Sequence, residues 1–160
     1  MIRKEDFRKF YDDTYDSSFM EAHMSSDYDW VDKCSASLVE VVKAGSVLDL
    51  GCGPGRWMAA AKAAGCDEVM GVEYNLELIR KSIPMILRGS IVEGDVSSPL
   101  DFGRKFDCVW SFKVAEHLPP EGSQTFVDNL VRHAERLVIM TAGWPGQGGL
   151  GHINCRPKAD

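Results

Sequence analysis

The chain has 160 residues, 44% of them hydrophobic and 26% charged, which excludes a collagen-like or wholly disordered chain and fits one globular domain. The formal net charge of −6 argues against broad electrostatic binding to nucleic acid or to an anionic membrane. No apolar run is long enough to span a bilayer, and charged residues occupy the N-terminus where a signal peptide needs its apolar stretch. Five widely spaced cysteines without a Cys-x-x-Cys pair predict idle thiols in a reducing compartment, so we expect a cytoplasmic protein.

Two helices are expected before the first strand. Aromatic residues at helical spacing, among them Phe7, Tyr11 and Tyr15, mark residues 4–15. A second helix is expected from Ser26, a favourable N-cap, to Gly45, which stands where a left-handed C-cap residue belongs.

From residue 46 the pattern alternates between strand and helix, which predicts a parallel sheet with helices on both faces. After residue 141 the glycine-rich tail predicts a loop. The expected strands cover residues 47–50, 68–73, 90–93, 106–111 and 137–141. Of the helices between them, the first ends near residue 65, the second starts after Asn75 and stops by residue 84, and the last spans about 126–134.

A glycine loop follows the first strand, with Gly51, Gly53 and Gly55 opening a helix. Residues without a Cβ let the chain bend sharply and let a ligand lie against the backbone. Glu73 ends the next strand, 22 residues after Gly51, where a carboxylate can accept hydrogen bonds from two ribose hydroxyls. Together these features predict an adenosine-containing ligand over the carboxyl ends of the first two strands.

The spacing of the loop distinguishes between such ligands. Dinucleotide-binding loops read G-x-G-x-x-G, whereas here the third glycine comes one position early and Arg56 stands in the sixth position. Pro54 removes one amide that phosphate would need, and the Asp49 carboxylate would repel a diphosphate. The loop therefore favours a ligand with a sulfonium and an amino-acid tail.

Four motifs in order carry a family resemblance: residues 49–55 (DLGCGPG), Glu73, the Gly94–Asp95 pair, and residues 106–111 (FDCVWS). With these the chain resembles the class I S-adenosylmethionine-dependent methyltransferases. The resemblance implies a Rossmann-like three-layer α/β sandwich with five parallel strands in the order 3-2-1-4-5. It divides a single domain (1–160) into N-terminal helices or lid (1–45), cofactor-binding core (46–141) and glycine-rich tail (142–160).

The family fold usually continues with a helix and an antiparallel hairpin, and the chain ends before either. We therefore expect strand five to be an exposed edge unless the tail or a second copy of the chain covers it.

The resemblance also implies roles for individual residues toward S-adenosylmethionine and its product S-adenosylhomocysteine. Asp49 would hold the amino group, Glu73 the ribose, Tyr74 and Asp95 the adenine, and the Val96 amide a ring nitrogen. Asp95 has a plainer alternative as a turn or cap residue. The full predicted cofactor set is Asp49, Gly51, Cys52, Gly53, Gly55, Glu73, Tyr74, Asn75, Asp95, Val96, Ser111, Phe112 and, from an N-terminal lid, Tyr15.

The acceptor side is expected after strands four and five. His117 has a pKa suited to taking a proton from an attacking hydroxyl or amine, and Glu116 could do the same or orient it; alternatively both only brace their loop. Trp144 and His152 are expected to form a substrate wall, with a merely flexible loop as the alternative. Glu116, His117 and His152 could assemble a metal site, but no two-histidine helical spacing supports one, so no metal is predicted.

The sequence thus predicts methyl transfer to an oxygen, nitrogen or carbon atom of a small-molecule or lipid-like acceptor. One alternative is a non-catalytic module that binds S-adenosylmethionine or S-adenosylhomocysteine, as a truncated or partner-dependent chain would. The other, an NAD-dependent oxidoreductase, is disfavoured by the early third glycine.

Overall fold

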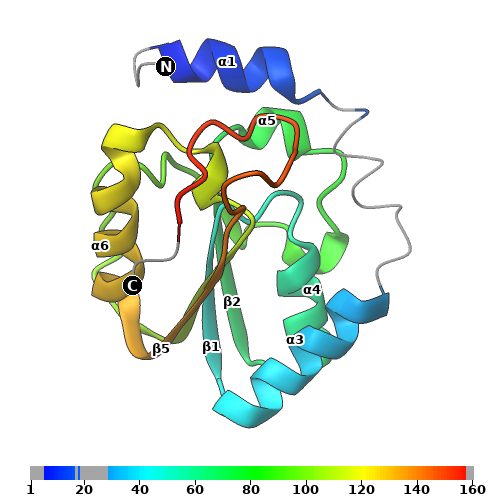
Figure 1. Cartoon of the computed structure of the whole chain (residues 1–160). Helices are drawn as coiled ribbons and strands as arrows, with labels where there is room; N and C mark the ends of the chain where they lie inside the picture. The colour runs from blue at the N-terminus through cyan, green and yellow to red at the C-terminus, as the bar shows by residue number, and fades with distance from the viewer. Residues whose placement is uncertain (1–5, 17, 19–28, 158–160) are drawn as a thin grey trace.

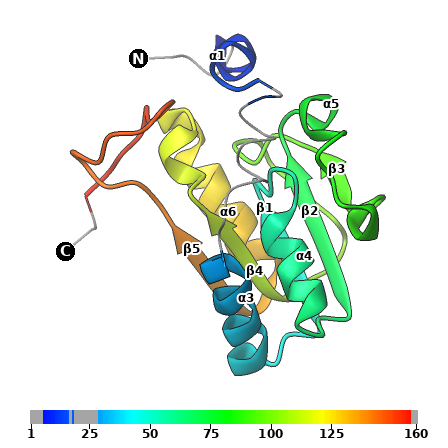
Figure 2. The ribbon, with the colours of Figure 1, turned by 90° about the vertical axis from the view of Figure 1, so that its right-hand side faces the viewer.

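The computed structural model describes residues 6–16, 18 and 29–157. Its five strands pair in parallel throughout, in the order β3-β2-β1-β4-β5, which confirms the predicted sheet (Figure 2). The strands are β1 (Ser46–Leu50), β2 (Glu68–Glu73), β3 (Ile91–Glu93), β4 (Phe106–Phe112) and β5 (Ala134–Thr141).

Helices cover both faces of this sheet and give the expected Rossmann-like sandwich (Figure 1). On one face α3 (Asp29–Val42) packs on α4 (Arg56–Ala63), and their apolar side chains meet Val47 and Trp110 of the central strands. On the other face α6 (Ser123–His133) buries Phe126 and Leu130 against Leu48, Leu50 and Val109. The central strands are apolar on both faces because both faces are covered.

A segment near each end of the chain lies at the carboxyl ends of the strands. Helix α1 (Phe7–Thr14) crosses this edge of the sheet, and the tail after β5 returns to it without forming a helix or strand (Figure 1). Short elements follow the carboxyl ends of β2 and β4: α5 (Leu76–Ile79), η3 (Ala115–His117) and η4 (Pro120–Gly122). A further short element, η2 (Met85–Leu87), precedes β3.

Three local predictions need correction. The helix after Asn75 ends at Ile79 instead of near Pro84, and η2 follows it. Strand β5 begins at Ala134, three residues earlier than predicted, directly after α6. Gly45 is not the left-handed residue after α3, because Lys43 takes that conformation, with φ of 50°; the Ser26 N-cap lies outside the described residues.

Strand β5 forms one edge of the sheet, and most of its side chains are exposed. Leu137 and Met140 are 39% and 42% exposed, and Val131 on the adjoining α6 is 62% exposed. In the part of the chain that the structure describes, no helix is long and apolar enough to cross a membrane.

Candidate functional site

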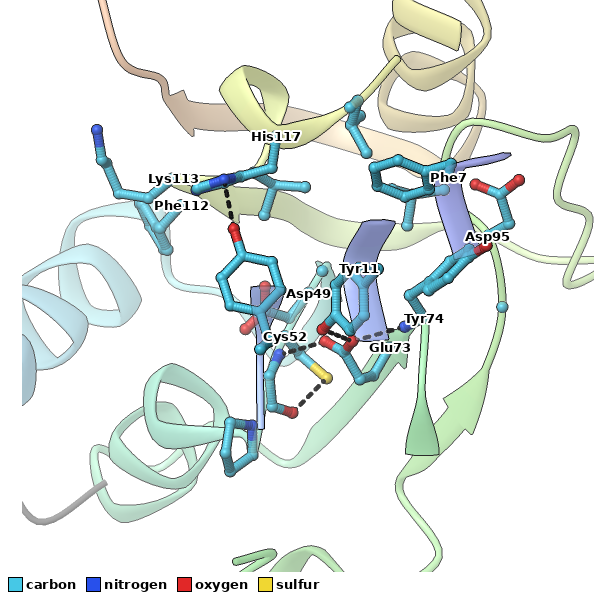
Figure 3. Close-up of a pocket in the computed structure, with 18 of the residues that line it drawn as sticks. Phe7, Tyr11, Asp49, Cys52, Glu73, Tyr74, Asp95, Phe112, Lys113 and His117 are labelled. Atoms are coloured by element: carbon cyan, nitrogen blue, oxygen red, sulfur yellow. Dashed lines mark hydrogen bonds between the residues drawn. The ribbon is translucent and has the colours of Figure 1, made fainter. Parts of the chain in front are cut away.

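A cavity of about 360 Å³ opens at the carboxyl ends of β1, β2 and β4, beneath α1 (Figure 3). This is where a doubly wound sheet places its ligand. Phe112, Lys113 and His117 stand at one end of it, and Tyr74, Asp95 and Phe7 at the other (Figure 3). Asp49 and Glu73 lie between them.

The glycine loop between β1 and α4 forms the floor of the cavity. Gly51 has φ of +80°, and a Cβ there would stand 2.5 Å from Val114 Cγ2, so both the turn and the packing require glycine. Gly53, which also lines the cavity, has φ of +51°, and nothing lies within 4 Å of where its Cβ would be. Gly55 also has positive φ, but a Cβ there would meet Leu87 at 2.6 Å, so it serves the packing under α4.

Glu73 connects this loop to β2 and to α1. The side chain is buried, and its Oε2 accepts a hydrogen bond from the Gly53 amide at 2.8 Å. Its Oε1 accepts from the Tyr74 amide and from the Tyr11 hydroxyl, each at 2.7 Å. Burial, followed by the charge of Glu73, raises the pKa of Tyr11, so Tyr11 stays a hydroxyl donor. The Asn75 amide also donates to Oε1, at 3.3 Å, so four donors fix the position of the carboxylate at the cavity.

Asp49 is a buried acid that lacks a full set of partners. The residue is 2% exposed, and its Oδ2 accepts no hydrogen bond from the described residues. Burial raises the pKa of Asp49 to about 8, the Trp110 indole offsets part of this, and the nearby Glu73 charge adds to it. Since an unpaired buried carboxylate is costly, this position favours a cationic ligand group beside the glycine loop.

Asp95 lies at the adenine end predicted for the cavity, but its carboxylate already has partners. Oδ1 accepts from the Ser97 amide at 2.8 Å and the Ser97 hydroxyl at 2.6 Å, and Oδ2 from the Ser98 hydroxyl at 2.7 Å. The turn role left open by the sequence is therefore present, in a residue that also lines the cavity.

His117 is held in one tautomer at the opposite end. Its Nδ1 lies 3.1 Å from the Gly151 carbonyl, which only accepts, so Nδ1 carries the proton. The Tyr15 hydroxyl, 2.7 Å from the same nitrogen, accepts from it as well and turns its own proton to the Leu150 carbonyl at 3.4 Å. Burial lowers the pKa of His117, so the ring is neutral near pH 7 and Nε2 keeps a lone pair.

Glu116 lies directly behind this histidine and is fully buried. Lys113 Nζ is 2.7 Å from Glu116 Oε1, and His152 Nε2 is 3.9 Å from the same oxygen. The rings of His117 and His152 meet edge to face with centroids 4.9 Å apart. The structure therefore brings His152 together with Glu116 and His117, although α6 and β5 lie between them in the sequence.

Most of the predicted residues lie at the cavity. Those that line it are Asp49, Gly51, Cys52, Gly53, Glu73, Tyr74, Asp95, Val96, Phe112, Tyr15, His117 and His152.

Five predicted residues do not line the cavity, and one of them is the fully buried Glu116 described above. Ser111 is buried and donates to the Leu50 carbonyl at 2.6 Å, between the strands. Asn75 caps α5 by accepting from the Leu78 amide. Gly55 packs against Leu87, and Trp144 is 66% exposed on the tail.

The sequence interpretation left out several lining residues. Tyr11 was considered for the N-terminal lid but, unlike Tyr15, was not assigned to the site, and Trp57 was assigned no role. Trp57 stacks on Phe112 with centroids 3.9 Å apart. Lys113, with φ of 61°, also lines the cavity. The four-residue spacing from Phe7 to Tyr11 to Tyr15 was the signal for a helix face that points at the cavity.

A sequence profile described as a methyltransferase domain matches residues 47–136, more than half of the chain. The chain belongs to the class I methyltransferase family. No curated protein sequence shows significant similarity to it.

Solved structures share this fold, among them two that are described as methyltransferases. DesVI of Streptomyces venezuelae is 26% identical, with a TM-score of 0.64 over 87% of this chain and 60% of that one. CalS10, an amino pentose methyltransferase from Micromonospora echinaspora solved with S-adenosylmethionine bound, is 23% identical, with a TM-score of 0.64 over 84% and 60%. The glycopeptide N-methyltransferase MtfA, in complex with S-adenosylmethionine, is 21% identical, with a TM-score of 0.53 over 65% and 46%. This methyltransferase domain thus spans about 60% of the length of the first two.

Proposed function

We propose that this domain binds S-adenosylmethionine in the cavity and transfers its methyl group to a small polar acceptor. The observation that carries the proposal is the pair of buried carboxylates on either side of the glycine loop. Asp49 lacks a partner for one oxygen, and Glu73 is fixed by the Gly53 amide. One suits an ammonium and the other suits ribose hydroxyls.

The remaining cofactor contacts follow from this placement. Gly53 leaves room for the ligand against the backbone, and Tyr74 and Val96 supply apolar surface for the adenine. The Tyr11 hydroxyl donates to Glu73 Oε1. A ribose hydroxyl would donate to the same oxygen, either beside the Tyr11 hydroxyl or in its place. S-adenosylmethionine, when bound, supplies an electrophilic methyl group on its sulfonium.

The acceptor is assigned to the end of the cavity formed by His117, Lys113 and Phe112. The His117 lone pair on Nε2 can take the proton of a hydroxyl or amine as that group becomes the nucleophile. Tyr15 and the Gly151 carbonyl hold the ring in the required tautomer. The acidic charge of the chain and the size of the cavity favour a small molecule over nucleic acid; a lipid-like molecule is the second acceptor class. The known acceptor classes of CalS10 and MtfA, an amino pentose and a glycopeptide, are compatible with this choice.

The chain's contribution to rate is alignment, exclusion of water and this proton transfer. Helix α1 covers the cavity with Tyr11 and Tyr15. The five free cysteines, three of them buried, fit a reducing compartment, so we place the activity in the cytoplasm.

The experiment that tests this function compares Glu73→Ala with Glu93→Ala, an exposed acid at the end of the next strand. Loss of Glu73 should weaken S-adenosylhomocysteine binding by about 1.5–3 kcal/mol, the scale of hydrogen bonds to a charged group, while Glu93→Ala leaves it within about twofold. Transfer of labelled methyl to a panel of small hydroxyl and amine compounds should fall in parallel. Tight cofactor binding with no transfer to any compound would instead support the non-catalytic module.

A further inference from the structure

The glycine-rich tail packs around three ligand-type side chains that the proposed function uses only in part. Ligand-capable atoms of Glu116, His117 and His152 all lie within 4.8 Å of one another. Glu116 and His117 come from η3, directly after β4, and His152 comes from the tail after β5. The two segments meet because β4 and β5 are neighbours in the sheet.

Glu116 is the unusual member of this cluster. Its carboxylate is fully buried, and neither of its oxygens accepts a hydrogen bond from the described residues. The Lys113 ammonium, 2.7 Å from Oε1, is its charge partner there, and that side chain is 46% exposed. A buried carboxylate paired mainly with a flexible, half-exposed lysine has coordination sites left for a cation.

Each histidine is oriented through Nδ1, which leaves Nε2 available. The Gly151 carbonyl accepts from Nδ1 of His117, and Cys155 Sγ lies 3.7 Å from Nδ1 of His152. A metal-binding imidazole commonly has its second nitrogen fixed in this way by a carbonyl or another polar group.

The tail fits closely around these rings. A Cβ on Gly149 would overlap the His152 ring, and one on Gly151 would overlap the Tyr15 hydroxyl. The Ile153 and Asn154 amides both donate to the Glu116 carbonyl, at 2.9 and 3.0 Å. The tail thus holds His152 against Glu116 as part of a built site.

We propose that Glu116, His117 and His152 bind a divalent transition-metal ion of the Zn²⁺ type. Two imidazoles and one carboxylate form a ligand set found in catalytic zinc sites, which keep a further position open. His117 and His152 line the cavity, so the open position would face it and take an oxygen ligand such as a hydroxyl or carboxylate. The oxygen-ligand class rests on the proposed function, whereas the ion site does not.

Binding of the ion would change two of the roles described above. His117 Nε2 would become a ligand, so it serves as a proton acceptor only in the metal-free protein. Lys113 would have to leave Glu116, because an ammonium and a metal ion compete for the same carboxylate. Removing the Lys113 charge should therefore strengthen metal binding.

The test is titration of the metal-free chain with Co²⁺, followed by visible absorption, with Zn²⁺ as competitor. We expect one Co²⁺ per chain with the d–d bands of a low-coordinate site, and full displacement by Zn²⁺. His152→Ala and Glu116→Gln should each weaken binding at least tenfold, whereas Lys113→Met should strengthen it. Cys34→Ser, which removes an exposed thiol able to bind Co²⁺ adventitiously, should leave the spectrum unchanged.

The proposal is overturned if the chain binds no stoichiometric Co²⁺, if Cys34→Ser abolishes the bands, or if both His152→Ala and Glu116→Gln keep full affinity while remaining folded by circular dichroism. S-adenosylhomocysteine binding is measured separately in the presence of a chelator. Failure there counts against the proposed function and leaves the metal result standing.

Discussion

At the scale of single residues, the chemistry of the cavity depends on charges buried beside a glycine loop. Asp49 and Glu73 were predicted from sequence because a loop of this spacing and an acid at the end of the next strand have few other uses. Ser111 was placed wrongly, since neighbouring strand residues point to opposite faces: Phe112 lines the cavity, whereas Ser111 bonds between strands. Strand periodicity alone could not say which of the two faces the ligand.

The first prediction concerns the pH dependence of cofactor binding. Asp49 has a pKa raised to about 8, so it is protonated at pH 6 and must lose this proton to pair with an ammonium. Affinity for S-adenosylhomocysteine should therefore rise toward pH 8, by up to about tenfold per pH unit. Calorimetry in buffers of different ionisation enthalpy should detect a released proton.

In Asp49→Asn this proton release and the rise in affinity should both disappear. The same substitution tests stability. A carboxyl whose pKa is raised on folding contributes stability below the unfolded pKa near 4, and that stability is lost as pH rises through 8. The free energy of unfolding of Asp49→Asn, measured with urea, should therefore increase relative to that of the wild type between pH 5 and 8. A difference between the two free energies that stays constant with pH would contradict the raised pKa.

The second prediction separates two glycines of the loop. Gly53→Ala meets open space and should cost about 1–2 kcal/mol of stability, from its left-handed backbone alone. Gly51→Ala adds a clash with Val114 and should cost more. Binding should be reduced in Gly53→Ala, because Gly53 lines the cavity and its amide fixes Glu73. Equal unfolding midpoints for the two variants would argue against the packing described for Gly51.

At the scale of elements, α1 and the tail complete a site that the sheet only begins. The helix was predicted as a lid and the tail as a substrate wall, but their contacts were not predicted. An amphipathic aromatic helix can pack on any apolar surface, and a glycine-rich segment carries no periodicity to show which residues it meets. Two glycines of the tail are required by their neighbours, because a Cβ on Gly149 would overlap the His152 ring and one on Gly151 the Tyr15 hydroxyl. Sequence reasoning identified the motif but not its contacts.

The third prediction tests α1 as a cover of the cavity. Phe7 is 3% exposed and meets the Tyr74 ring at 5.2 Å, which anchors α1 over the end of β2. Phe7→Ala should raise the dissociation rate of S-adenosylhomocysteine about tenfold, because burying a phenyl ring stabilises docking by several kcal/mol. Stopped-flow displacement measures the rate, and Val41→Ala, 81% exposed on α3, is the control. An unchanged rate would mean that α1 does not limit exchange.

At the scale of the whole molecule, the strand order and layers were predictable from four motifs in sequence, since parallel alternation leaves few topologies. What the sequence could not supply is the amount of apolar surface left on the β5 edge. Leu137, Met140 and Val131 are each exposed by more than a third. Such an edge is a site for pairing with another strand.

The fourth prediction is therefore self-association of this chain through β5. Sedimentation velocity should show the association increasing with protein concentration. Met140→Lys should reduce it, because a charge on an edge strand opposes pairing, and Glu135→Lys, which only changes the sign of an exposed charge near the start of β5, should reduce it less. A monomer at every concentration would exclude this use of the edge.

The central claim is that the cavity binds S-adenosylmethionine and its product, and one titration tests it most directly. The purified chain is titrated calorimetrically with S-adenosylhomocysteine, with NAD as the control ligand. We predict one site of micromolar affinity for S-adenosylhomocysteine and no measurable binding of NAD. A folded chain that binds neither ligand, or that prefers NAD, would contradict the assignment of Asp49 and Glu73 to this cofactor.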